Sequence, residues 1–140
     1  MEIGDLSLII QIVIFFTLIL GLPLTREAPK NSKNLLRHGY LTTFALTLHT
    51  ALVVVVMIIL ALDGYADILS LPALSLVVDL GHIILGFSAV VLGWIVVAYW
   101  FSNPLKTLGC YKTKKLMLPV IVIWALSLIM GAIIHLLDFF

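Results

Sequence analysis

Four long apolar segments, separated by short polar ones, dominate the pattern of hydrophobic and polar residues along the chain. They cover approximately residues 3–24, 35–62, 72–101 and 114–138. Each is about twenty residues long or longer, which is enough for an α-helix to cross the roughly 30 Å hydrocarbon core of a bilayer. The pattern therefore predicts an all-α fold, a bundle of four transmembrane helices that forms one integral membrane domain over residues 1–140.

The composition agrees with a chain that lies almost entirely in lipid. Of the 140 residues, 63% are hydrophobic and 11% are charged, whereas soluble domains carry about 25% charged residues. The sequence contains no flavin motif, no nucleotide-binding loop and no stretch long enough for a soluble redox domain. We therefore expect an electron-transfer or accessory subunit more than a stand-alone enzyme.

The charged residues are unevenly distributed. All eight Lys and Arg residues fall in segments 25–37 and 102–115, and six of the seven acids lie elsewhere. Short cation-rich loops remain in the cytoplasm, so we expect a multi-pass protein of the cell membrane with both basic loops cytoplasmic and both termini external. Basic clusters can bind nucleic acid, but their position beside the spans indicates topology, and the expected partner is the lipid bilayer.

Four histidines within the apolar segments are the candidate functional residues. They are His38, His49, His82 and His135. Ionisable residues inside a membrane are costly and usually face a bundle interior or a functional path. Gly86 follows His82 by one helical turn, and Gly131 precedes His135 by one turn. Small residues beside a histidine leave room either for a flat ligand or for a closely packed helix, and both interpretations remain open.

The depth of each histidine determines which of them can meet. His82 and His135 both lie within about two turns of the external end, while His49 is deeper by roughly 10 Å or more and His38 is at the opposite end. Two neutral imidazoles on facing helices can occupy the axial positions of a haem iron. We therefore predict a haem b between His82 and His135, with Gly86 and Gly131 making room for the ring. The alternative pairs His49 with either of them and places the haem deeper.

Two carboxylates accompany the external histidines at helical spacing. Asp79 stands three residues before His82, and Asp138 stands three residues after His135. Each can orient the neighbouring ring by accepting a hydrogen bond from its second nitrogen. The two acids can equally be ordinary interfacial residues. A further alternative is a copper or zinc site formed by all four side chains, because imidazole and carboxylate suit these metals.

Three stretches of the sequence resemble a family of small membrane proteins. They are RHGYLTTFALTLHT, GHIILGFSAVVLG and KKLMLPVIVIWALSLIMGAIIH. They resemble the four-helix proteins grouped around YozB, which are associated with the maturation of haem–copper oxidases, and they are also similar to b-type membrane cytochromes. The resemblance implies that His38, His49, His82 and His135 are functional positions.

Together these features give two main expectations of function. The first is a haem b protein that transfers electrons to or from a membrane quinone pool or a larger respiratory complex. The second is a cofactor-free accessory or assembly subunit that packs against other membrane protein subunits, as glycine-rich helix faces allow. A metal-binding protein that uses the histidine and aspartate set is the third.

Overall fold

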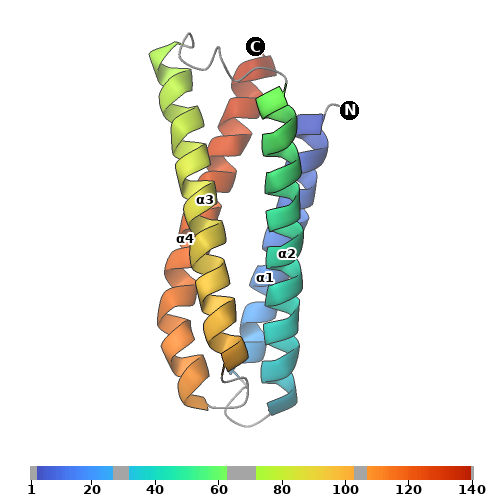
Figure 1. Ribbon diagram of the computed structural model, residues 1–140, viewed down its shortest axis with the longest axis vertical. Coiled ribbons are helices and arrows are strands. Elements are labelled where there is room, and N and C mark those ends of the chain that lie inside the picture. The colour runs from blue at the N-terminus through green and yellow to red at the C-terminus, as the bar shows by residue number, and fades with distance from the viewer. Residues whose placement is uncertain (1–2, 27–31, 63–71, 103–106, 140) are drawn as a thin grey trace.

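The computed structural model is a bundle of four antiparallel α-helices (Figure 1). The structure describes residues 3–26, 32–62, 72–102 and 107–139, and these contain no β-strand. The helices are α1 (Ile3–Arg26), α2 (Ser32–Leu62), α3 (Ala73–Ser102) and α4 (Thr107–Phe139). All four are long and apolar enough to cross a membrane. The predicted all-α, four-helix membrane bundle is therefore confirmed.

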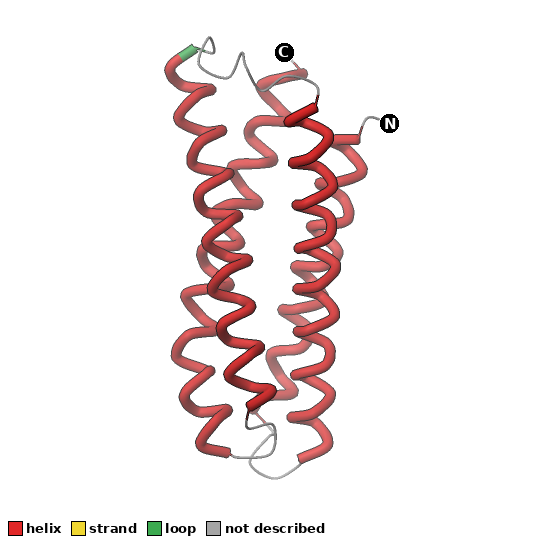
Figure 2. The backbone as a smooth tube through the Cα atoms, in the orientation of Figure 1, coloured by secondary structure: helices red, strands yellow, loops and turns green. Residues whose placement is uncertain are grey.

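The bundle consists of two helix pairs. α3 packs most extensively against α4, and α1 packs against α2, while contacts between α2 and α3 and between α1 and α4 are fewer. We call the boundary between the α1/α2 pair and the α3/α4 pair the seam; it runs the length of the bundle (Figure 2). The first residue of α1 and the last residues of α4 lie at one end of the bundle, together with the end of α2 and the start of α3 (Figure 1).

The two basic segments differ from the expectation that both are loops. α2 begins at Ser32 and α4 begins at Thr107, so Arg37, Lys112 and Lys115 lie on helices rather than in connections. Lys, Arg and Leu are good helix formers, and a helix keeps its backbone hydrogen bonds when it continues from the hydrocarbon into the polar headgroup region. The charged residues thus extend α2 and α4 beyond the segments predicted from hydropathy.

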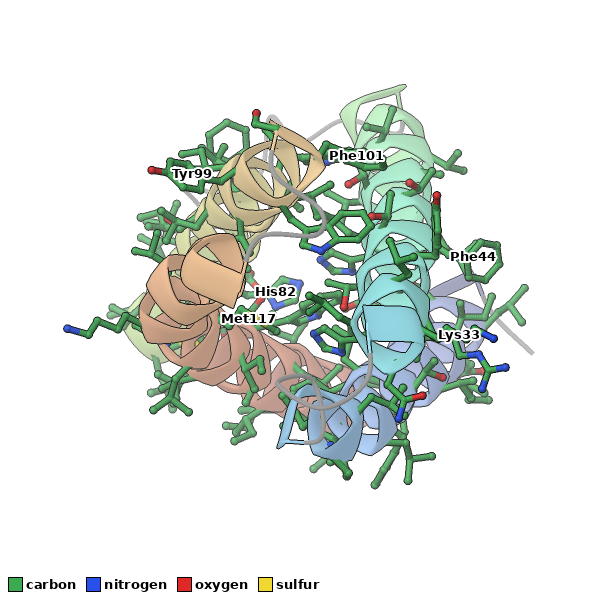
Figure 3. The ribbon with its side chains drawn as sticks, turned by 90° about the horizontal axis from the view of Figure 1, so that it is seen from below. Lys33, Phe44, His82, Tyr99, Phe101 and Met117 are labelled. Atoms are coloured by element: carbon green, nitrogen blue, oxygen red, sulfur yellow. The ribbon has the colours of Figure 1, made fainter. Side chains whose placement is uncertain are left out.

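Large apolar side chains cover the outside of the bundle as well as its interior. Exposed ones occur on every helix, among them Phe16, Phe44, Phe87 and Leu118. Seen along the bundle, Phe44 and Tyr99 point outward while His82 points into the interior (Figure 3). A helix that is hydrophobic all round is buried in lipid or in a large core, so this outer surface is suited to contact with a bilayer.

Small residues determine how closely the helices approach. Ala89 of α3 is completely buried in a cluster that contains Ile14 and Leu18 of α1 and Trp124 of α4. A Cβ atom added at Gly81 would come within 2.8 Å of the terminal methyl group of Met130, so α3 meets α4 closely at this point. Close approach of this kind is typical of helix association in membranes.

Candidate functional site

His38 is buried at the basic end of the bundle and is held by α1. Its Nδ1 lies 2.9 Å from the carbonyl oxygen of Gly21. A carbonyl only accepts, so Nδ1 carries the proton and Nε2 of the neutral ring carries the lone pair. This Nε2 is buried and has no hydrogen-bond partner among the described residues.

His49 is the most deeply buried histidine, with 2% of its surface exposed. Its ring stacks on the indole of Trp124 across the seam, with 4.1 Å between ring centroids and 37° between planes. Neither ring nitrogen has a hydrogen-bond partner within the described part of the chain. An unsatisfied buried polar group costs on the order of 1–3 kcal/mol, so these two unpaired nitrogens lower the stability of the bundle.

His82 is fixed between α3 and α4. Its Nδ1 donates to the carbonyl oxygen of Ser127 at 2.8 Å, and the Ser127 hydroxyl donates to the His82 carbonyl oxygen at 3.2 Å. The neutral ring therefore carries its lone pair on Nε2, as in His38. A metal-bound histidine is commonly held in this manner, with its other nitrogen donating to a backbone carbonyl.

His135 lies near the opposite end of the bundle from His38 and contacts α1. Its Nε2 is 2.9 Å from Oδ1 of Asp5, and the side chains of His135 and Asp5 are 39% and 33% exposed, respectively. The sequence prediction did not include Asp5, because nothing in the sequence shows that α1 and α4 are neighbours. A pair as exposed as this contributes little to stability.

The four histidines therefore have separate contacts rather than forming one cluster. His49 lies on α2 and His82 on α3, so these two belong to opposite helix pairs. His135 is bound to Asp5 and His38 to Gly21, each at its own end. Within the described ranges, no group of three or more His, Cys, Asp or Glu side chains is arranged to hold a metal ion.

The two predicted aspartate partners stay predictions. The Nδ1 atom of His82 is bonded to Ser127, and Asp79 is half-buried on α3. The side chain of Asp138 falls outside the described residues. The serine was not singled out from the sequence, although Ser127 lies three residues after Trp124 and four before Gly131 on the same helix face.

The two glycines predicted to make room for a haem lie in the α3–α4 contact. A Cβ atom at Gly131 would come within 2.9 Å of Cε1 and 3.2 Å of Nδ1 of His82, so the imidazole rests on this glycine. A Cβ atom at Gly86 would come within 3.1 Å of the Ser127 hydroxyl. Both glycines therefore make space for a side chain of the neighbouring helix.

Two cavities adjoin His38 in the half of the bundle nearer the basic segments. The larger has a volume of about 40 Å³ and is lined by all four helices, with His38, Thr42 and Trp124 as its polar side chains. The smaller, of about 20 Å³, lies between α2, α3 and α4 and shares His38 and Thr42 with the larger. Its third polar side chain is Trp100.

No family model, curated protein or solved structure matches the chain. The resemblance to the YozB-like proteins therefore rests on the residues quoted above.

Proposed function

We propose that this chain is an integral membrane protein that binds haem b at the seam and transfers electrons within the bilayer. The observation that carries the proposal is His49, an almost fully buried imidazole whose nitrogens both lack a partner among the described residues. Such a group is costly in an apolar interior unless a ligand satisfies it. An imidazole lone pair buried inside an apolar helix bundle is a suitable axial ligand for haem iron.

Of the pairings considered, we favour His49 with His82 as the axial ligands. They come from opposite helix pairs, since His49 lies on α2 and His82 on α3. His82 is oriented by Ser127 so that Nε2 carries the lone pair. His135 has a partner of its own in Asp5, which makes the shallower pairing of His82 with His135 the less favoured one.

A haem can enter this bundle only if the two helix pairs separate. The larger cavity of about 40 Å³ has room for two or three water molecules, far less than a porphyrin needs. The seam is the boundary with the fewest helix contacts, so separation there disturbs the packing least. Bound haem would supply a one-electron redox centre, while the chain would hold the iron, exclude water and orient the ring.

The test is the reduced-minus-oxidised absorption spectrum of the purified protein and of single histidine variants at matched protein levels. Wild type should show b-type bands, and both His49→Ala and His82→Ala should lose them. His135→Ala serves as the control and should keep the spectrum, because its ring is bound to Asp5. Loss of haem in His135→Ala with full occupancy in His49→Ala would instead support the shallower pairing.

A second candidate is a cofactor-free accessory or assembly subunit of a larger membrane enzyme. The observation that favours it is the close packing at Gly86 and Gly131, where an added Cβ atom would meet Ser127 of α4 and His82 of α3, respectively. The resemblance to proteins of haem–copper oxidase maturation is consistent with this role. A colourless wild-type protein that co-purifies with an oxidase subunit would support it over haem binding.

The orientation in the cell membrane is part of the same proposal. The basic residues next to α2 and α4 favour a cytoplasmic position for this end of the bundle and an external position for both termini. A quinone or a larger respiratory complex remains the proposed electron partner. Neither a copper nor a zinc site gains support, since no group of three or more His, Cys, Asp or Glu side chains within the described residues is arranged to hold a metal ion.

A further inference from the structure

We propose that Trp94 and Thr50 form a latch that holds the seam shut beside His49 and so controls how fast a ligand reaches this histidine. Trp94 lies on α3 and Thr50 on α2, so the hydrogen bond between them joins the two helix pairs. The choice of haem as the ligand rests on the proposed function. The latch does not, because it is a property of the ligand-free bundle.

The hydroxyl group of Thr50 is oriented to accept from Trp94. It donates its own proton to the carbonyl oxygen of Leu46 at 2.8 Å, and the indole N–H of Trp94 donates to it at 3.0 Å. An indole N–H surrounded by hydrocarbon finds no water to replace a lost acceptor, so this bond favours the closed seam. Trp94 is 38% exposed on the outside of the bundle, and its ring can therefore swing outward when the bond breaks.

The latch lies where the close packing of α2 on α3 ends. One turn from Thr50 toward the basic end, a Cβ atom at Gly93 would come within 2.9 Å of Cδ1 of Leu46. Farther in the same direction, a Cβ atom at Gly39 would overlap ring atoms of Trp100. Toward the opposite end, α2 and α3 diverge (Figure 1). Loss of the latch therefore lets this divergence extend along the seam toward the basic end.

His49 is the residue that such an opening would uncover. It precedes Thr50 directly on α2, it is 2% exposed, and neither of its ring nitrogens has a partner among the described residues. Its contact with Trp124 across the seam is a ring contact, with 4.1 Å between centroids, and has no hydrogen bond to break. A ligand that enters from the bilayer between α2 and α3 thus reaches the imidazole after the latch has opened.

The first experiment measures the rate of haem uptake by the ligand-free protein in micelles, followed by stopped-flow absorption. Trp94→Phe keeps an aromatic ring without the N–H group, and Thr50→Val keeps the side-chain shape without the hydroxyl. Each should raise the association rate about threefold to tenfold, the equivalent of one hydrogen bond between membrane helices. The double variant should be no faster than either single one, because both changes remove the same bond. Thr47→Val is the matched control, since its hydroxyl bonds to Thr43 on its own helix; its rate should equal that of wild type.

A second experiment detects the opening without haem. In a cysteine-free background, the thiol introduced by His49→Cys should react with a lipid-soluble maleimide at a rate set by the population of the open seam. Trp94→Phe and Thr50→Val should each raise this rate by the same factor as haem uptake. Val97→Cys places a thiol at a buried position of α3 between Trp94 and Trp100, and its reaction should not be accelerated.

The two experiments distinguish the latch from the cofactor. Unchanged alkylation at position 49 in both latch variants, or equal acceleration at position 97, would overturn the latch. Accelerated alkylation at position 49 alone, in a protein whose wild type takes up no haem, would refute haem binding and support the latch.

Discussion

Among the glycines of the described residues, Gly39 on α2 is the one where an added methyl group should disturb the bundle most. A Cβ atom placed there overlaps ring atoms of the Trp100 indole on α3. Trp100 is 8% exposed and also packs edge-on against Tyr40, with 5.7 Å between ring centroids. The rigid indole cannot bend away, so Gly39→Ala must displace the whole ring or force the helix pairs apart.

The expected cost follows from what the indole loses. Complete removal of a buried Trp side chain costs about 3–5 kcal/mol, which is the upper limit for a displaced ring. Replacement of Gly by Ala in a helix gains about 1 kcal/mol. We therefore expect Gly39→Ala to lower the free energy of unfolding by about 2–4 kcal/mol.

Gly81 provides a control with a clash of similar kind but different rigidity. A Cβ atom there comes within 2.8 Å of the terminal methyl group of Met130. That methyl group can move by a change of rotamer at a cost of roughly 0.5–1.5 kcal/mol. The gain in helix propensity offsets most of this cost, so Gly81→Ala should leave stability nearly unchanged.

The assay is reversible unfolding in mixed micelles, followed by far-UV circular dichroism as denaturing detergent is added. Gly39→Ala should also be measured in a Trp100→Leu background, where the smaller side chain relieves the overlap. The penalty of the added methyl group should largely disappear there, giving a coupling energy of about 2 kcal/mol or more. If the penalty is the same in both backgrounds, or if Gly81→Ala is as damaging as Gly39→Ala, the reasoning is wrong.

Two further predictions concern the ends of the bundle. Asp5→Asn should lower the free energy of unfolding by less than about 1 kcal/mol and by still less at high salt, because the pair with His135 is partly exposed. A double-mutant cycle with His135→Ala measures the coupling energy, and a value above about 2 kcal/mol would contradict a surface pair. In a cysteine-free background, a cysteine at position 63 should be labelled from outside intact cells and one at position 112 should not; labelling of both from outside would reject the proposed topology.

The fold was predictable because a bilayer permits only a few kinds of backbone structure. A segment of about twenty apolar residues in a membrane must form a helix, since no solvent can satisfy its backbone groups. The periodicity also identified the face of α3 that carries His82 and the face of α4 that carries Gly131. These inferences need only the geometry of a single helix.

The contacts of the histidines could not be predicted from the same pattern, because they depend on which helices are neighbours. The sequence pattern offered Asp79, on the same helix, as a candidate partner of His82; it could not show that the Nδ1 atom of His82 is bonded to Ser127 on α4. The indole of Trp124 on α4 contacts the ring of His49 on α2, and no pattern within either helix predicts this contact. Helical spacing identifies the residues that share a face but not the side chains opposite them.

The way the two helix pairs are joined indicates where the bundle can open. Within each pair, a histidine is bonded directly to the backbone of its neighbour, as His82 is to Ser127. Across the seam, Trp94 donates to the hydroxyl of Thr50 at 3.0 Å, the indole of Trp124 contacts the ring of His49, and His135 pairs with Asp5. Side-chain tips can swing through rotamer changes, while close backbone packing is lost in one step. Separation along the seam therefore disturbs fewer helix contacts than separation within a pair, and it exposes His49, whose nitrogens have no partner in the described part of the chain.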